Sequence, residues 1–316
     1  MKRGDIKANR VMASKPSQNK TFKELAEEFI RQAEIRNLSE WTIKSYKHHT
    51  QYFIDFAGNE LMCKDIGLDL IEKYILYMKK DKQLSNTVTL NSYIRNISPI
   101  IKYGISKRYI LNDFMIPIIK GQETFKDIYT DDELKALLES PTKKDFVATR
   151  TYTIVWVLAS TGIRARELRE LKVKNVDMMN RAISVNETKN KKPRRVPISK
   201  SMYDVMLDYI EMRGGDPEDY LFPTVYNEIM AMSSLQDSVK KYCNERGVYK
   251  TSLHLFRHTF ITNAVNQNVN PLILQRITGH STMQQLNKYY NARTVDLVDV
   301  IDGIAPKSNK KQIYFK

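Results

Sequence analysis

The chain has 316 residues, of which 42% are hydrophobic and 28% are charged, and its formal net charge is +15. This composition suits one large globular domain or two smaller ones, and we expect two. The positive charge attracts polyanions, so nucleic acid and an anionic membrane surface are the candidate partners. The sequence lacks both a membrane-spanning apolar stretch of ~18 residues and the apolar core of a signal peptide.

The two cysteines, Cys63 and Cys243, lie far apart in the sequence. They support neither a disulfide framework nor a cysteine-based metal site, and we expect both thiols to be reduced. With no signal peptide, this pattern predicts a cytoplasmic protein.

The N-terminal part predicts a basic arm followed by a small helical domain. Residues 1–20 carry six basic side chains and one acidic one without an apolar period, which predicts a flexible arm. Thr21 and Glu24 form a capping box, so folded structure should begin there. Ser39 should cap a second helix, and two more are expected over "LDLIEKYILYMKK" and "TVTLNSYIRNISPIIKYGISKRY". We assign this domain of four helices to residues 21–114.

A linker is expected over residues 115–129, where a proline and a glycine interrupt any period. A capping box at Thr130 then opens a second domain, residues 130–302, whose first long helix is "FVATRTYTIVWVLAS". Alternating "RAISVNE" and "RRVPI", separated by a lysine-rich turn, predict a β-hairpin, and helices follow. The chain is therefore expected to be mainly α with a small antiparallel sheet and a C-terminal tail, residues 303–316.

Three short segments of the second domain carry side chains suited to phosphate chemistry. They are "TGIRARELREL" at 161–171, "HLFRHTF" at 254–260, and "ITGHS" at 277–281, which is followed by Tyr289. Each segment is weak evidence alone. In this order, with a basic hairpin between the first two and a helical domain ahead, they resemble the tyrosine recombinase, or phage integrase, family over roughly residues 21–300.

The resemblance implies both a fold and a reaction. Members of the family combine a helical, SAM-like core DNA-binding domain with a mostly helical catalytic domain. They cut and rejoin double-stranded DNA through a 3′-phosphotyrosine intermediate, without a metal ion or a nucleotide cofactor. By resemblance, the chain is expected to be a monomer free in solution and a homo-tetramer on two synapsed sites. It would then act in the cytoplasm at the nucleoid, with no membrane partner.

Attack on a phosphodiester builds negative charge on the non-bridging oxygens, which planar guanidinium groups match well. By resemblance, Arg164 occupies the family's first arginine position, and Glu167 matches the acidic residue that orients it. Seen alone, this pair is typical of a surface ion pair on a helix.

His254, Arg257 and His258 lie at i, i+3 and i+4, so they share one side of a helix. By resemblance, His254 and Arg257 belong to the active site, and His258 is a structural donor. The rival interpretation is a zinc site, but Leu255 stands where a zincin motif has its glutamate, so no metal is expected.

By resemblance, His280 fills the position from which a histidine or tryptophan donates a hydrogen bond to the scissile phosphate. Without the tyrosine that follows, it would be read as a turn or cap residue. Lys189 in the hairpin matches the lysine that protonates the departing 5′ oxygen. The family usually flanks this lysine with glycines, which are missing here, so Lys191 and Lys192 remain alternatives.

The adjacent tyrosines at 289 and 290 can be separated by their helical angles. At ~100° per residue, Met283, Leu286 and Tyr290 fall on one apolar stripe of a helix capped by Ser281, whereas Tyr289 falls on a polar side. The family's spacing from the histidine also selects Tyr289. We therefore expect Tyr289 to be the nucleophile and Tyr290 to be a core residue.

Integration or excision of a mobile element is the expected event, and Xer-type dimer resolution or inversion are alternatives. Because the stretch before residue 21 is short, no separate arm-binding domain is expected. By resemblance, the tail is passed to a neighbouring protomer, and Ile313, Tyr314 and Phe315 are expected to dock there. A type IB topoisomerase and a non-catalytic DNA-binding protein are rival functions, and the involvement of an accessory directionality factor stays open.

Overall fold

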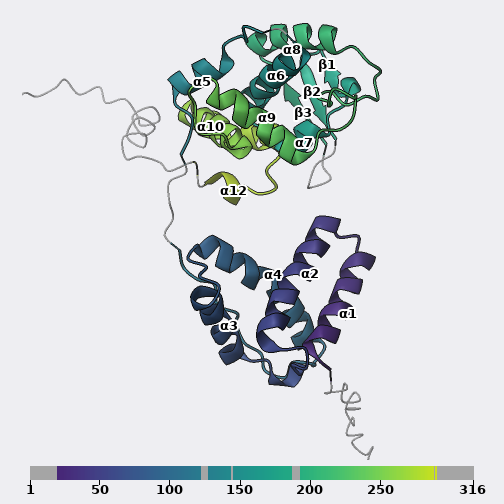
Figure 1. The fold of residues 1–316 in the computed structure, drawn as a ribbon, viewed down its shortest axis with the longest axis vertical. Helices are drawn as coiled ribbons and strands as arrows, with labels where there is room; N and C mark the ends of the chain where they lie inside the picture. The colour runs from purple at the N-terminus through teal and green to yellow at the C-terminus, as the bar shows by residue number, and fades with distance from the viewer. Residues whose placement is uncertain (1–19, 122–126, 144, 187–192, 288, 290–316) are drawn as a thin grey trace, which may run out of the picture. The chain divides into compact units, whose positions relative to one another are not determined.

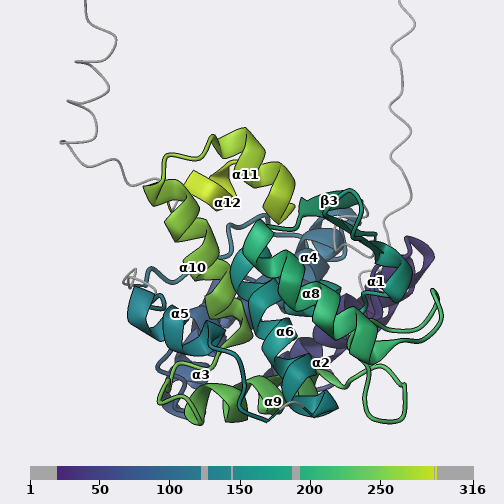
Figure 2. The same ribbon diagram turned by 90° about the horizontal axis from the view of Figure 1, so that it is seen from above.

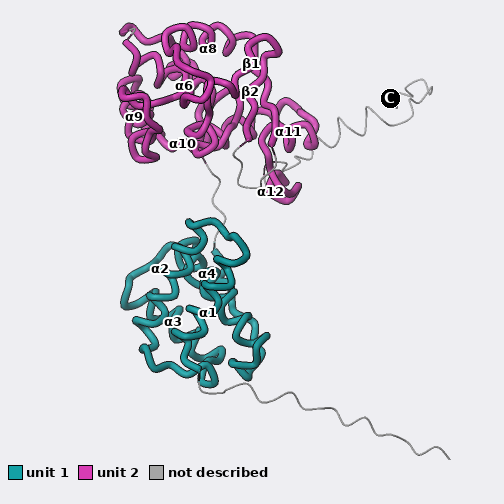
Figure 3. Tube along the Cα trace, turned by 90° about the vertical axis from the view of Figure 1, so that its right-hand side faces the viewer, with its two compact units in different colours: residues 1–124 teal, residues 125–316 magenta. Residues whose placement is uncertain are grey.

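The computed structural model describes residues 20–121, 127–143, 145–186, 193–287 and Tyr289. The chain divides into two compact units, residues 1–124 and 125–316 (Figure 3). Each unit buries a hydrophobic core of its own. The expected basic arm, apart from Lys20, and the C-terminal tail lie outside the described residues.

The described part of unit 1 contains four α-helices (Figure 1). Thr21 caps α1 as predicted: its Oγ1 accepts from the Glu24 backbone N–H at 3.2 Å, and its own N–H donates to the Glu24 carboxylate at 2.8 Å. Ser39 likewise caps α2. The elements are α1 (Phe22–Ile35), α2 (Glu40–Ala57), the short 3-10 turn η1 (Cys63–Asp65), α3 (Leu68–Lys80) and α4 (Thr87–Ser106).

Aromatic rings join the helices of unit 1. The ring of Phe53 on α2 lies 4.8 Å from the ring of Phe22 on α1 and 5.0 Å from that of Tyr74 on α3, edge to face in both pairs. All three side chains are fully buried, so this cluster fixes three helices around one core.

Unit 2 is built around α6 (Phe146–Thr161), which is apolar on nearly every side. Four helices pack against it: α5 (Asp131–Leu138), α8 (Lys200–Arg213), α9 (Met232–Asn244) and α10 (Leu253–Asn266) (Figure 2). Ile154, Val157 and Leu158 of α6 are fully buried in the resulting core. The capping box predicted at Thr130 opens α5.

A three-stranded antiparallel sheet forms one side of unit 2. Its order is β1 (Val176–Asp177), β2 (Ala182–Val185) and β3 (Arg194–Pro197). The predicted hairpin is β2–β3, with Ile183 opposite Val196 and Val185 opposite Arg194. β1 was not predicted, because two residues are too short to show an alternating pattern. Residues 187–192 of the hairpin, including Lys189, lie outside the described residues.

The last described elements form a small cluster of their own. Buried Ile261, Leu274 and Leu286 join α10 to α11 (Pro271–Thr278) and α12 (Gln284–Asn287). α11 also contacts β3, which brings the two segments side by side (Figure 2). The short α7 (Ala165–Arg169) and η2 (Val173–Asn175) connect α6 to the sheet. In the described part of the chain, no helix has the length and apolar character needed to cross a membrane.

Candidate active site

Arg164 is the N-cap residue of α7 and follows the turn that ends α6. Its Nη1 donates to Oε1 of Glu167 at 2.9 Å, and its backbone N–H donates to Oε2 at 3.0 Å. Glu167 is only 3% exposed and the Arg164 side chain is 28% exposed, so a partly buried arginine binds a buried carboxylate and the pair is not an ordinary surface pair. Nη2 of Arg164 donates to the carbonyl oxygen of Gly279 at 3.0 Å, which places the guanidinium group next to the segment carrying His280.

Arg194 was missed as a site residue by the sequence analysis. Its Nη1 and Nη2 donate to the two carboxylate oxygens of Glu167 at 3.0 and 2.7 Å, and its Nε donates to the carbonyl oxygen of Ile277 at 2.8 Å. Strand alternation was a usable signal, because it places Arg194 on the same face as the core residue Val196. An arginine on that face requires a buried acidic partner.

Glu167 is the shared anion of this cluster. Burial raises its pKa, but the hydrogen bonds and charges of Arg194 and Arg164 outweigh burial and hold the pKa below its ordinary value. The carboxylate is therefore ionised at neutral pH, and it fixes both guanidinium groups through charge-assisted hydrogen bonds.

Arg257 and His280 meet from α10 and the turn after α11. Nη1 of Arg257 donates to the carbonyl oxygen of Gly162 at 2.6 Å, and its Nη2 lies 3.1 Å from Nε2 of His280. Nδ1 of His280 lies 2.8 Å from Oγ1 of Thr278. Burial lowers the pKa of Arg257 to about 9, and the positive charge of Arg164 acts in the same direction. A phosphate anion beside these cations would be favoured electrostatically.

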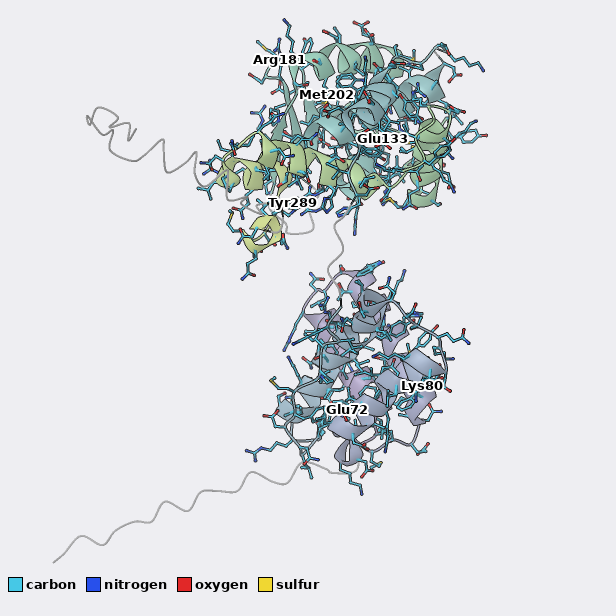
Figure 4. All side chains as sticks on the ribbon, turned by 90° about the vertical axis from the view of Figure 1, so that its left-hand side faces the viewer. Glu72, Lys80, Glu133, Arg181, Met202 and Tyr289 are labelled. Carbon is cyan, nitrogen blue, oxygen red and sulfur yellow. The ribbon has the colours of Figure 1, made fainter. Side chains whose placement is uncertain are left out.

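Tyr289 lies just beyond α12, at the edge of unit 2 (Figure 4). Its ring centroid is 4.7 Å from that of His258, and the ring is half-buried against the small cluster of α10, α11 and α12. Burial raises the pKa of Tyr289, whereas the charge of Arg257 lowers it, and the net change is upward. Proton removal from the phenol therefore needs help at neutral pH.

The helical-stripe argument for the tyrosines is wrong in part. α12 spans only Gln284–Asn287, so Tyr289 lies in a turn rather than on a helix face, and its ring covers apolar side chains. Ser281 is not the N-cap residue of α12, because this helix begins three residues later, at Gln284. Its backbone N–H donates to the side chain of Gln285 at 3.3 Å. Tyr290, which was expected in the core, lies outside the described residues.

His254 is exposed in the first turn of α10, with its ring centroid 6.1 Å from that of His258. Lys189 lies outside the described residues, so its position relative to the other groups remains a prediction. Among the residues that the structure places, no group of three or more histidine, cysteine or acidic side chains is arranged to hold a metal ion.

Five side chains of unit 2 are linked by hydrogen bonds, directly or through the Gly279 backbone: Arg164, Glu167, Arg194, Arg257 and His280. Arginine charge and hydrogen-bond donors beside a tyrosine suit a phosphodiester that is attacked by a phenol.

A model of the "Phage integrase family" matches residues 128–295, and a model of the "Phage integrase SAM-like domain" matches residues 21–118. The chain belongs to the phage integrase family.

The recombinase is similar to named members of the family along most of its length. A tyrosine recombinase of Pseudothermotoga lettingae is 27% identical over 276 residues, which cover 85% of this chain and 94% of that protein. The tyrosine recombinase XerC of Pelobacter propionicus is 24% identical over 283 residues, with coverage of 86% and 92%. These matches confirm the family and the enzyme class expected from the three motifs: the protein is a site-specific DNA recombinase.

Solved structures confirm the fold class. A Tn1549 transposon integrase in complex with a circular intermediate DNA aligns with the recombinase at a TM-score of 0.77 and 23% identity, covering 90% of this chain and 99% of the other. The XerH recombinase bound to its difH substrate aligns at 0.68 with 20% identity, covering 90% and 84%. Like the family, the recombinase is mainly helical with a small sheet in its second unit.

Proposed function

We propose that the recombinase binds double-stranded DNA and that Tyr289 attacks a backbone phosphorus atom of the bound site. Arg164 and Arg257 neutralise the charge that develops on the non-bridging oxygens. Nε2 of His280, which accepts from Arg257 in the free protein, becomes protonated in the DNA complex and donates a hydrogen bond to one of these oxygens. The observation that carries this proposal is the 3.1 Å contact between Arg257 and His280, beside the Gly279 carbonyl that Arg164 holds at 3.0 Å.

The reaction is a transesterification. The phenol oxygen of Tyr289 forms a bond to phosphorus as the bond from phosphorus to the 5′ oxygen breaks, which leaves a 3′-phosphotyrosine and a free 5′ hydroxyl. His254 is the candidate base for the phenol proton, and Lys189 is the candidate acid that protonates the leaving oxygen. Attack by the 5′ hydroxyl of a partner strand reverses these steps, so the phosphodiester energy is kept throughout.

The biological event that we propose is integration or excision of a mobile element. The structural match to a transposon integrase favours this event, whereas the similarity to XerC and XerD proteins favours dimer resolution as the second candidate. Either event requires two DNA sites, and we propose a homo-tetramer with tails exchanged between protomers. A cytoplasmic, nucleoid-associated enzyme fits this role.

The first experiment compares Tyr289→Phe with Tyr290→Phe on a nicked substrate that traps the cleaved state. Tyr289→Phe should bind DNA like the wild type but form no adduct that resists SDS, because it lacks the attacking oxygen. Tyr290→Phe is the matched control and should still form the adduct. The opposite pattern would contradict the choice of nucleophile.

The trapping assay excludes one rival function, and a two-site recombination assay excludes the other. A non-catalytic DNA-binding protein forms no covalent adduct at all. A type IB topoisomerase relaxes supercoiled DNA but yields no recombinant products from two sites. Salt sensitivity does not separate these functions, because counterion release weakens every basic DNA-binding protein.

A further inference from the structure

Arg194 and Arg164 share one buried carboxylate. Oε1 of Glu167 accepts from Nη1 of both arginines, and Oε2 accepts from Nη2 of Arg194 and from the backbone N–H of Arg164. A carboxylate has about four acceptor sites, so these four bonds saturate it. The side chain of Arg194 is only 8% exposed, so its hydrogen bonds are made to protein groups and little of it contacts solvent.

The two arginines also hold the same turn at the end of α11. Nε of Arg194 binds the carbonyl oxygen of Ile277, one of the carbonyls that a helix C-terminus leaves without an intrahelical partner. Arg164 binds the carbonyl oxygen of Gly279, two residues further on. A Cβ added to Gly279 would lie 2.9 Å from Nη1 of Arg194, so the guanidinium group lies directly against this backbone.

The turn 277–279 leads straight into His280. Its backbone direction and the side chain of Thr278, whose Oγ1 lies 2.8 Å from Nδ1 of His280, together set where the imidazole points. The other ring nitrogen then meets Arg257 at 3.1 Å. A displacement of the turn would therefore move His280. It would also move the Gly279 carbonyl oxygen to which Arg164 is bound.

We propose that Arg194 is a positioning residue for DNA cleavage. By joining β3 and Glu167 to the turn 277–279, it holds Arg164 and His280 where the scissile phosphate needs them. It acts through these residues and has no contact with the DNA of its own. The proposal rests on the proposed function, since it assigns a further residue to the same site.

The test measures the rate of covalent adduct formation at saturating nicked DNA, together with DNA affinity. Arg194→Gln should lower this rate by about 100-fold, because small misplacements of catalytic groups have effects of that size. Affinity should change little. Arg194→Lys keeps the charge but cannot bridge both oxygens of Glu167 and the Ile277 carbonyl, so its rate should also fall, though less.

Arg195→Gln is the matched control. Arg195 is the next residue of β3, but its side chain is 59% exposed and paired with Asp177 at 2.9 Å on the other face. This variant removes the same charge from the same strand and should cleave within about two-fold of the wild-type rate. If both Arg194 variants cleaved like Arg195→Gln, or lost only DNA affinity, the proposal would be overturned.

A double-mutant cycle tests the route of the effect. Because Arg194 acts through the turn that carries His280, Arg194→Lys should slow cleavage much less in a His280→Ala background than in the wild type. Fully additive losses would assign Arg194 a general structural role and overturn the proposal. Denaturant unfolding of each variant identifies any rate loss that reflects unfolded protein.

The two proposals fail in different ways. A wild-type enzyme that forms no adduct at Tyr289 would contradict the proposed function before any Arg194 variant is compared. A wild-type adduct at Tyr289 with unaltered cleavage by both Arg194 variants would leave the function intact and reject only the positioning role.

Discussion

Glu167 binds two arginine side chains although it is almost fully buried. Removing one partner of a buried ion pair is strongly destabilising, because the remaining charge is left uncompensated in a poorly solvated site. Tyr289 is in the opposite situation, since its ring is held by packing against His258 and its phenol must lose a proton to react. The candidate site therefore combines a network of ion pairs with a proposed nucleophile, Tyr289, whose ring packs against His258 and a small apolar cluster.

Glu167→Gln should reduce the free energy of unfolding of unit 2 by about 3 kcal/mol at neutral pH, the low end for breaking a buried ion pair. Denaturant unfolding measures this loss. Glu218→Gln is the matched control, because Glu218 also binds two cations, Lys172 and Lys174, but is 64% exposed. Surface pairs contribute little, so this control should lose far less stability. Equal losses in the two variants would contradict the account.

The stability difference between wild type and Glu167→Gln should depend on pH. The pKa of Glu167 is lowered in the folded protein, so its contribution is fully present above its ordinary pKa of 4.5 and is lost as pH falls through the folded pKa. Unfolding curves from pH 7 downward should thus show the two proteins converging below about pH 4.5. A difference that stays constant or grows on acidification would contradict the assignment.

At the scale of elements, the C-terminal end of α11 connects the parts of the candidate site, because Arg164 and Arg194 both bind its backbone carbonyl oxygens. Gly279 has φ of +67°, a region that L-residues avoid, and the Arg194 guanidinium fills the space where a side chain would begin. Both features select glycine here. The guanidinium cannot move aside without losing its bonds to Glu167 and Ile277.

Gly279→Ala should lose roughly 1–2 kcal/mol of stability from backbone strain and should also slow DNA cleavage. Gly247→Ala separates these effects, since Gly247 has φ of +71° but open space around its Cβ position. It should show similar strain with wild-type cleavage. Unfolding and single-turnover cleavage, measured on both variants, test this difference. Equal cleavage rates of Gly279→Ala and Gly247→Ala would show that the conformation at the end of α11 does not contribute to cleavage.

The sequence predicted the elements whose boundaries depend on interactions between residues close together in the chain. The capping boxes at Thr21 and Thr130 mark real helix starts, and alternation found the β2–β3 hairpin. The turn that holds Tyr289 escaped the analysis, because α12 stops after four residues and tertiary packing sets the rest. The bonds of Arg194 to Glu167 and Ile277 were not predicted either, because these partners are distant in sequence, although strand alternation places Arg194 on the core face of β3.

At the scale of the whole molecule, the chain carries one buried thiol in each unit. Cys63 lies in the core of unit 1 and Cys243 in the core of unit 2, and both are fully buried. Burial raises the pKa of each thiol to about 11. Each cysteine should therefore stay unreactive until its own unit opens.

Thiol labelling along a denaturant series should report the two units separately. In Cys243→Ser, labelling of Cys63 follows unit 1, and in Cys63→Ser, labelling of Cys243 follows unit 2. Adding Glu167→Gln should lower the midpoint for Cys243 and leave that for Cys63 unchanged, because Glu167 belongs to unit 2 alone. A joint shift of both midpoints would show that the chain unfolds as a single cooperative body.

The central claim is that Tyr289 becomes covalently joined to a DNA 3′ end. Peptide mapping by mass spectrometry of the adduct trapped on a nicked site tests this claim most directly. The account predicts a single modified peptide with the nucleotide on Tyr289, and a free 5′ hydroxyl on the released strand. Attachment at Tyr290 or any other residue, or a 5′-linked nucleotide, would contradict it.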